Sequence, residues 1–578
     1  MLKTLLKSVR EYKLFTFLTP LFVVIDTLFF ALIPSMMADL IDQGITPGRL
    51  DIVYEIGLKL LLVTVLMTVF GVLGGLFAAK ASGGFAKNIR HDVFYKIQDF
   101  SFSNIDKFNS SSLIVRLTTD IQRLQRAYQM TIRLAFRAPF SLIFACVMAF
   151  SINKKLAMTF LYVIPVIAII MGIIIKLALP RFEKVYKEYD SLNSVVKENL
   201  DGIRVVKAYV REDQQEAKFQ KESANIERLY KSAYKLPILA QPLMTVIVFG
   251  VSILIIWFGS KMVVASTLTT GELVGLVSYT SMALFGLIML SIVFVMITIS
   301  MASVKRVVEV LNEEPEIVNK DNTIKDVKDG SVVFEDVDFS YLKRNDKLVL
   351  SNININIPSG HKVGIIGGTG SSKSTLVQLL PRLYDVDKGS VKIGGIDVRD
   401  YDLKALRDNV AFVLQKSVLF SGTVEENLRW GNQNATLEQI IEAAKIAQAH
   451  SFIQEFEDAY QYKIDQGGLN VSGGQRQRLS IARALLKSPK VIIFDDSTSA
   501  VDMATEASIR EGLAKNLPGL TQIIIAQRIV SVQDCDTIYV LDDGKIVGEG
   551  THEELLESNE IYQEVYNSQM REESDGSK

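Results

Sequence analysis

Residues 361–375, with the sequence HKVGIIGGTGSSKST, combine the residue types that bind a phosphate group. The apolar run 363–366 is typical of a buried strand, a glycine- and serine-rich turn follows it, and Lys373 then opens an apolar helical pattern. Consecutive backbone N–H groups in such a turn, together with a helix N-terminus, form a nest for an anion. We therefore predict a phosphate-binding loop in which Lys373 reaches the phosphates of a nucleotide and Ser374 binds Mg²⁺.

This loop departs from the pattern G-x-x-x-x-G-K-[ST] at one position, because Ser372 stands where the pattern has glycine. Glycine there would allow a close approach of backbone to phosphate or an unusual φ/ψ pair. The alternative interpretation of this stretch alone is a strand-to-helix turn that binds nothing. The residues predicted to contact nucleotide here are Gly367, Gly368, Thr369, Gly370, Ser371, Ser372, Lys373, Ser374 and Thr375.

Polar side chains recur in the C-terminal half just after strand-like runs. They are Gln415 after the run 410–414, Asp495 and Asp496 at the end of VIIFDD, and Gln527 at the end of IIIAQ. A buried strand that ends in two acids can present the first to a metal ion and the second to the group beyond it. The stretch VSGGQ at 471–475 precedes a helical pattern, and Tyr341 lies upstream of the loop, where it could stack on a base.

Length and composition limit the class of protein. A chain of 578 residues is too long for one core, so two or more domains are expected. A formal net charge of −1 gives no electrostatic argument for nucleic acid as a partner. The first half holds long apolar runs, whereas the second half has the pattern of a soluble α/β domain. The two cysteines, Cys146 and Cys535, do not suggest a disulfide framework.

Six apolar segments are long enough to cross ~30 Å of hydrocarbon at about 20 residues each. Two long connections, 85–129 and 180–237, are rich in Lys and Arg, which places them and both termini in the cytoplasm. Both connections show helical periodicity, so we expect the membrane helices to continue beyond the bilayer. The predicted spans are near 14–41, 56–84, 130–151, 156–179, 238–262 and 272–300.

The predicted fold class is a polytopic α-helical membrane domain fused to an α/β domain with a phosphate-binding loop. The expected boundaries are a membrane domain over 1–310, a polar linker over 311–330, the α/β domain over 331–570 and a polar tail over 571–578.

A few residues within the spans are candidates for substrate contact. Asp26 lies about halfway along the first span, where an ionisable side chain is costly and a functional role is the default hypothesis. The alternatives are a paired structural carboxylate or a position nearer the interface. Met282, Phe285 and Met289 of the last span would suit an adaptable apolar cavity, but they could equally be core or lipid-facing residues.

These stretches together resemble the ATP-binding cassette (ABC) exporter family, in the form of a half-transporter with the membrane domain ahead of the nucleotide-binding domain. The resemblance covers nearly the whole chain. GGTGSSKS resembles the Walker A loop, Gln415 the Q-loop, VSGGQ the family signature, VIIFD the Walker B strand and SAVD (499–502) the D-loop, and Gln527 stands at the position of the switch histidine. The stretches 109–122, 198–212 and 268–279 are also similar, and the first two are expected to contain the coupling helices that dock on the nucleotide domains.

Two departures from the family pattern fall on the hydrolytic step. The resemblance implies a catalytic glutamate after Walker B, where this chain has the shorter Asp496, and a histidine where it has Gln527. A displacement of about 1 Å at such a group can reduce the rate by ~100-fold, and an amide can donate a hydrogen bond but neither gains nor loses a proton at neutral pH. The signature core of Ser472, Gly473, Gly474 and Gln475 is intact, and in this family it completes the site of the paired chain.

The resemblance therefore implies the degenerate-site subunit of a heterodimeric bacterial multidrug exporter, in which a second ABC half-transporter supplies the catalytic glutamate and the histidine. Its cofactors would be ATP and Mg²⁺, with Ser374, Gln415 and Asp495 near the metal, and its substrate a lipophilic small molecule. It would lie in the cell membrane with the nucleotide domain in the cytoplasm. The alternatives are a homodimeric exporter of lipids or peptides and an ATP-binding regulatory subunit that transports nothing.

Overall fold

The computed structural model describes residues 1–341, 348–497 and 501–576. The chain forms two compact units. The first comprises Met1–Gln98 and Ser110–Glu313, and the second comprises Asp99–Asn109 and Glu314–Lys578. A short segment from the N-terminal half thus belongs to the C-terminal unit, whereas the sequence boundaries assigned no residue before 311 to it.

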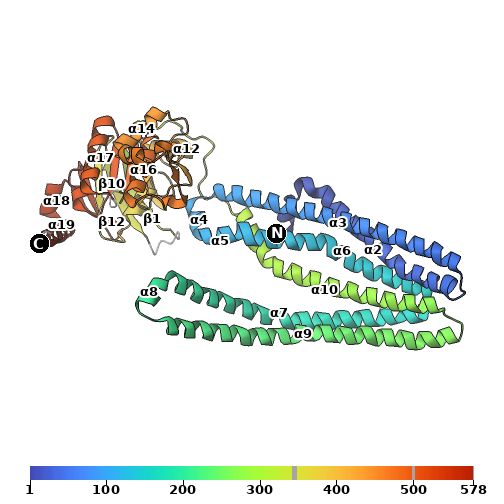
Figure 1. Cartoon of the computed structure of the whole chain (residues 1–578). Helices are drawn as coiled ribbons and strands as arrows, with labels where there is room; N and C mark the ends of the chain where they lie inside the picture. Colours follow the sequence, from blue (N-terminus) through green and yellow to red (C-terminus); the bar gives the residue numbers. More distant parts are fainter. Residues whose placement is uncertain (342–347, 498–500, 577–578) are drawn as a thin grey trace. The chain divides into compact units, whose positions relative to one another are not determined.

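Long helices make up the first unit (Figure 1). Within the described residues, six helices are long and apolar enough to cross a membrane, and each predicted span lies inside one of them. Helices α7 and α9 lie side by side, joined by the short α8, and continue well beyond the predicted spans as expected. The long helices are α2 (Lys13–Asp39), α3 (Leu50–Gln98), α6 (Ile121–Ile152), α7 (Lys154–Asp201), α9 (Glu212–Val264) and α10 (Thr270–Asn312). The short ones are α1 (Leu2–Lys7), α5 (Ser110–Val115) and α8 (Ile203–Ala208).

The second unit is built on a six-stranded sheet in the order β12-β11-β3-β10-β9-β6. All its strands are parallel except β12, which pairs antiparallel with β11. The strands are β3 (Lys362–Ile366), β6 (Val410–Val413), β9 (Val491–Asp495), β10 (Thr521–Ile525), β11 (Thr537–Asp542) and β12 (Lys545–Gly550). Because β3, β10, β9 and β6 are adjacent and parallel, the segments that follow them emerge at one edge of the sheet, where ligands bind in open α/β folds.

A smaller antiparallel sheet, in the order β2-β1-β4-β5, accompanies the first. It comprises β1 (Val332–Phe339), β2 (Leu350–Ile357), β4 (Lys388–Ile393) and β5 (Ile396–Asp397), and a two-stranded ribbon joins β7 (Gly422–Thr423) to β8 (Lys463–Ile464). The helices are α4 (Phe102–Phe108), α11 (Lys373–Gln378), α12 (Leu403–Asn409), α13 (Val424–Arg429), α14 (Leu437–Ile446), α15 (His450–Glu455), α16 (Gly473–Leu485), α17 (Met503–Asn516), α18 (His552–Ser558) and α19 (Glu560–Gly576).

The parallel strands are buried on both faces, which explains their continuous apolar runs. In β9, Ile492 and Phe494 face the core cluster shared with α14 and α16, whereas Val491 and Ile493 face the cluster shared with β1 and β2. Two hydrophobic cores therefore hold the sheet rigid, and the edge that carries the polar residues is fixed by both.

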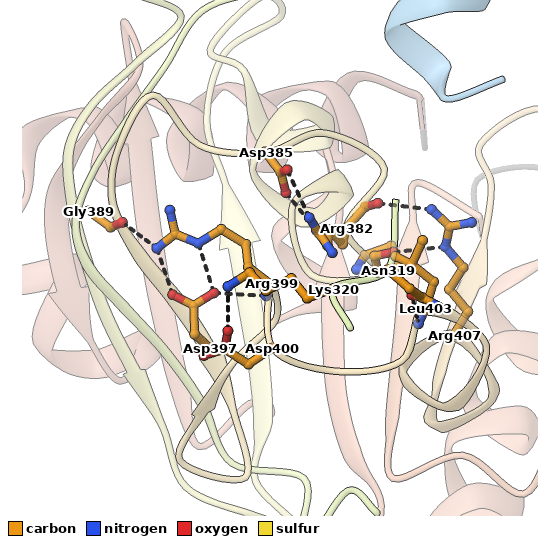
Figure 2. A network of polar contacts seen from close by, with 11 residues as sticks. Asn319, Lys320, Arg382, Asp385, Gly389, Asp397, Arg399, Asp400, Leu403 and Arg407 are labelled. Carbon is orange, nitrogen blue, oxygen red and sulfur yellow. Dashed lines mark hydrogen bonds and ion pairs between the residues drawn. The ribbon is translucent and has the colours of Figure 1, made fainter. Parts of the chain in front are cut away.

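Polar contacts fix the segment that follows α11 (Figure 2). The Arg382 guanidinium donates two hydrogen bonds to the Asp385 carboxylate, at 2.7 and 3.1 Å. From α12, Arg407 donates to the backbone oxygens of Pro381 (3.1 Å) and Arg382 (2.9 Å). The segment is held by its own side chains and by α12, and Tyr384 within it is placed with little freedom.

Helix α4 is the segment from the N-terminal half that belongs to the second unit. The Tyr384 hydroxyl donates to Asp106 Oδ2 at 2.6 Å, and the Phe102 and Tyr384 rings meet edge to face at 6.0 Å. Asn104 donates to the backbone oxygen of Glu314 at 3.1 Å. These contacts make α4 a docked part of the second unit.

The sequence predicts that the first docking helix lies within 109–122, and docking of those residues on a nucleotide domain stays a prediction. Those residues form α5, the π-helix η3 (Arg116–Asp120) and the start of α6, all in the first unit, and α4 lies one segment earlier. The boundary is Asn109, whose φ of 58° ends α4. Residues 198–212 contain α8, and its docking on a nucleotide domain stays a prediction.

Candidate functional site

The phosphate-binding loop runs from the end of β3 to the start of α11, as the sequence predicts. Gly368, Thr369 and Gly370 are exposed at its tip. A Cβ on Gly367 would lie 2.0 Å from the backbone oxygen of Leu541, so only glycine fits there. The loop is thus a tight turn with an open backbone, the form needed to surround a phosphate group.

Lys373 folds back over this loop. Its Nζ donates to the backbone oxygens of Gly367 (2.9 Å) and Gly368 (2.8 Å) and to Ser371 Oγ (3.1 Å). Burial lowers the pKa of the Lys373 ammonium, against the attraction of the Asp496 and Asp495 carboxylates. A partly desolvated ammonium inside a turn of backbone amides is suited to bind an anion.

Ser374 and Asp495 form the candidate Mg²⁺ site. Ser374 Oγ donates to Asp495 Oδ1 at 2.8 Å, which brings together two residues far apart in the sequence. Asp495 is 4% exposed; burial raises the pKa of its carboxyl, and the hydrogen bond from Ser374 opposes the rise. A hydroxyl and a carboxylate are hard oxygen ligands that fit Mg²⁺ when nucleotide phosphates complete its shell.

Asp496 lies between two side-chain amides. Its Oδ2 accepts hydrogen bonds from Gln527 Nε2 (2.9 Å) and Gln415 Nε2 (3.1 Å). Its backbone φ of 46° is in the left-handed region, which aspartate tolerates better than most residues. The structure therefore brings the predicted residues Gln415, Asp496 and Gln527 into one cluster, and Gln415 bonds to Asp496, whereas the sequence placed it near the metal.

Ser372 is in the left-handed region, with φ 74° and ψ 20°. It is the residue just before α11, and its side chain makes no capping hydrogen bond to that helix. The loop thus needs the backbone conformation that glycine adopts most readily. The sequence pattern anticipated a special φ/ψ pair at this position.

Tyr341 borders the loop, and its stacking on a base stays a prediction. Its hydroxyl shares a hydrogen bond of 2.9 Å with Thr375 Oγ1 on α11, and its ring meets those of Phe339 (5.0 Å) and Tyr384 (5.2 Å) edge to face. Burial raises the pKa of Tyr341. Tyr384 touches both Tyr341 and Asp106 of α4, so the docked helix and the predicted base-stacking residue share a neighbour.

The signature residues lie at the N-terminus of α16, a helix of 13 residues. Ser472 Oγ accepts from the backbone N–H of Gln475 (3.2 Å), while the Gln475 side chain accepts from the Ser472 N–H (2.9 Å). Ser472 and Gly473 are exposed, and Gly474 is half-buried. A capped helix start with exposed N–H groups can bind an anion from outside the chain.

The predicted D-loop lies partly outside the described residues, which omit 498–500. Of its four positions, Val501 is buried and Asp502 caps α17 by accepting from the backbone N–H of Thr505 at 2.9 Å.

The candidate substrate residues do not form one cluster. Asp26 is 5% exposed and its Oδ2 lies 3.3 Å from an Arg137 nitrogen on α6, which favours the alternative of a paired structural carboxylate. Met282 is packed in a core cluster with Tyr279, Phe285 is 63% exposed, and Met289 is half-buried. A substrate role for these four stays a prediction.

Two contributors to the site were missed by sequence reasoning. Tyr384 lies in a turn with no motif, and Gln569 lies on the C-terminal helix, where its side chain bonds to the loop that carries Gln527. The only signal for Tyr384 in the sequence was a weak one, an aromatic residue soon after α11. No sequence pattern marks Gln569.

Comparisons with known proteins identify the family of both halves of the chain. The family described as "ABC transporter transmembrane region" matches residues 16–288, and the family described as "ABC transporter" matches residues 350–499. The second match contains the phosphate-binding loop, the signature and the strand β9.

Relatives of similar length match both halves together. An uncharacterized ABC transporter ATP-binding protein, YfiB of Bacillus subtilis, is 35% identical over 537 residues, which cover 93% of each chain. An ATP-dependent lipid A-core flippase of Desulfotalea psychrophila is 33% identical over 485 residues, or 84% of each chain. The putative ABC transporter ATP-binding protein exp8 of Streptococcus pneumoniae is 30% identical over 581 residues, 98% of this chain and 97% of the relative. This chain accordingly belongs to the ABC exporter family, as a multi-pass membrane protein whose transmembrane domain is fused to a cytoplasmic ATPase domain.

Proposed function

We propose that this chain is the hydrolytically impaired half of a heterodimeric ABC exporter of lipophilic compounds. It binds ATP and Mg²⁺ at its own phosphate-binding loop and lends its signature to the catalytic site of a second half-transporter. The homodimeric exporter and the regulatory subunit remain the competing functions.

The observation that carries the proposal is the pair of amides on Asp496 Oδ2. A general base must take a proton from water, yet this oxygen already accepts from Gln415 and Gln527. Neither amide can relay a proton. Aspartate also reaches about one methylene less far than the glutamate of the family pattern, so the carboxylate is both shorter and held back.

The remaining groups support ATP binding at the same site. Lys373 and the exposed loop amides can hold the phosphates, Ser374 and Asp495 can hold Mg²⁺, and Tyr341 can stack on the base. Bound Mg²⁺ supplies charge neutralisation of the phosphates. The exposed Ser472 at the start of α16 supports a contribution to the partner's site.

The proposed substrates are lipophilic compounds. The similarity to an ATP-dependent lipid A-core flippase supports amphiphilic lipids as members of this class. The Asp26–Arg137 pair does not favour a cationic substrate, because the carboxylate already has a cation.

Restoring the missing groups tests the proposal. The double variant Asp496→Glu with Gln527→His should hydrolyse ATP that the parent retains, so nucleotide extracted from the mixed complex after one turnover should shift from ATP to ADP. The control, Asp534→Glu with Gln533→His, makes the same two changes outside the site. ATP hydrolysed equally fast in parent and variant would contradict impairment, and ATP retained in both would show that the two residues do not cause it.

A further inference from the structure

The C-terminal helix α19 reaches back to the loop that carries Gln527. Gln569 on this helix uses both ends of its side-chain amide: Nε2 donates to the backbone oxygen of Gln527 at 2.8 Å, and Oε1 accepts from the backbone N–H of Ile529 at 2.9 Å. Because one planar amide bonds to two backbone groups on either side of Arg528, it fixes the path of the chain between them.

Helix α19 is also attached to the rest of the domain by side chains nearer its N-terminus. Tyr562 is fully buried, at 0% exposure, and its hydroxyl shares a 2.7 Å hydrogen bond with His552 Nδ1. The Tyr566 ring packs on the same histidine, with ring centres 5.6 Å apart. Residues 562, 566 and 569 follow the spacing of one helix face, so the anchored face also presents Gln569 to the loop.

The loop in turn positions the side chain that contacts Asp496. Gln527 Nε2 donates to Asp496 Oδ2 at 2.9 Å, and the Asp496 carboxylate interacts electrostatically with Lys373 of the phosphate-binding loop. A third phosphate beside Lys373 would add negative charge close to Asp496. The Gln527 amide is one of two neutral donors to this carboxylate, with that of Gln415, and its place depends on the backbone that Gln569 holds.

We propose that Gln569 is a positioning residue of the nucleotide site: by fixing the backbone from Gln527 to Ile529 it keeps the Gln527 amide on Asp496, and so contributes to the preference for ATP over ADP. The inference rests on the proposed function in one respect, which is that ATP binds at the loop of Lys373. A purely structural role for Gln569, holding α19 on the domain, would affect ATP and ADP equally.

The chain offers a matched control on the same helix. Gln563 Nε2 donates to the backbone oxygen of Leu556 at 2.6 Å, a contact within the α18–α19 pair that does not involve the Gln527 loop. Methionine is close to glutamine in length and forms no comparable hydrogen bond. Gln569→Met and Gln563→Met therefore each remove one glutamine's hydrogen bonds from α19, but only the first releases the loop.

The experiment uses the full-length chain in lipid nanodiscs, with ATP and ADP competing in turn against fluorescent trinitrophenyl-ATP in the presence of Mg²⁺. Gln569→Met should lower the ratio of ATP affinity to ADP affinity about two- to tenfold, the effect of one to two ordinary hydrogen bonds. Gln563→Met should leave the ratio unchanged. In a Gln527→Ala background, Gln569→Met should have no further effect, because both changes act on one contact.

Hydrogen exchange provides a second readout that needs no nucleotide. The peptide containing Ile529 should exchange faster in Gln569→Met than in the parent or in Gln563→Met. Equal loss of ATP and ADP affinity, the same ratio change in the control, or additive effects with Gln527→Ala would overturn the positioning role. A parent chain that binds no ATP would contradict the proposed function instead, and unchanged exchange at Ile529 would contradict the contact itself.

Discussion

Replacing Ser372 by glycine is expected to stabilise the nucleotide domain. Ser372 has φ 74° and ψ 20°, and its side chain makes no capping hydrogen bond that the change would remove. The substitution therefore relieves backbone strain at the residue where the phosphate-loop pattern has glycine.

The magnitude follows from two opposing terms. A non-glycine residue in the left-handed region costs roughly 1–2 kcal/mol. Glycine loses about 0.5–1 kcal/mol more conformational entropy on folding than other residues. The midpoints of the two ranges leave a rise of about 0.75 kcal/mol in the free energy of unfolding, which for a domain of about 150–250 residues corresponds to a Tm increase of about 1.5–3 °C.

Tryptophan fluorescence can follow this domain within the full chain. The chain has two tryptophans; Trp430 stacks on Phe420 at 4.1 Å in the nucleotide domain, and Trp257 lies on α9. In a Trp257→Phe background, thermal unfolding in nanodiscs would report on Trp430 alone. The control is Ser371→Gly, since Ser371 is buried, lies outside the left-handed region and accepts a hydrogen bond from Lys373. Its Tm should fall; an unchanged or lower Tm for Ser372→Gly would refute the strain argument.

Three other predictions concern separate parts of the chain. Ser374→Ala should abolish the gain in ATP affinity that Mg²⁺ gives, measured by titration with Mg²⁺ and with EDTA; a retained gain would exclude Ser374 as a ligand. Asp26→Asn should lower the Tm of the membrane domain more than Asp26→Asn with Arg137→Gln, because the single change removes the carboxylate that pairs with the half-buried Arg137; the opposite order would contradict the ion pair. Burial raises the pKa of Cys535 to about 12, so the thiol stays protonated at pH 8, and maleimide labelling followed by mass spectrometry should modify it only after denaturation; labelling of the folded chain would contradict its burial.

The sequence was most informative for residues that directly follow parallel strands, because such residues meet at one edge of the sheet. Ser374 and Asp495 were assigned separately to a metal site, and the parallel pairing of β3, β10 and β9 brings them within a hydrogen bond of each other. The apolar runs before them identified these strands because strands buried on both faces have no alternation. The missing glycine likewise pointed to a position that is strained in the structure.

Contacts between side chains from different loops could not be predicted in the same way. The sequence analysis treated Asp496 and Gln527 as two independent departures. In the structure the Gln527 amide donates a hydrogen bond to Asp496, and the Gln415 amide donates a second one to the same oxygen. The sequence did not single out α4, because its place in the second unit depends on contacts of Asn104 and Asp106 with residues more than 200 positions later in the chain. Gln569 had no motif, since its role depends on the packing of α19 against the domain.

ATP turnover by the chain alone and in a mixed complex tests the central claim most directly. The chain would be purified in nanodiscs by itself and then co-expressed with a half-transporter from the same membrane. We expect negligible turnover from the single chain, activity in the mixed complex, and loss of that activity when Ser472→Ala is introduced. Turnover of about 1–10 per second from the single chain, an ordinary enzymatic rate, would contradict the impaired site and favour the homodimeric exporter.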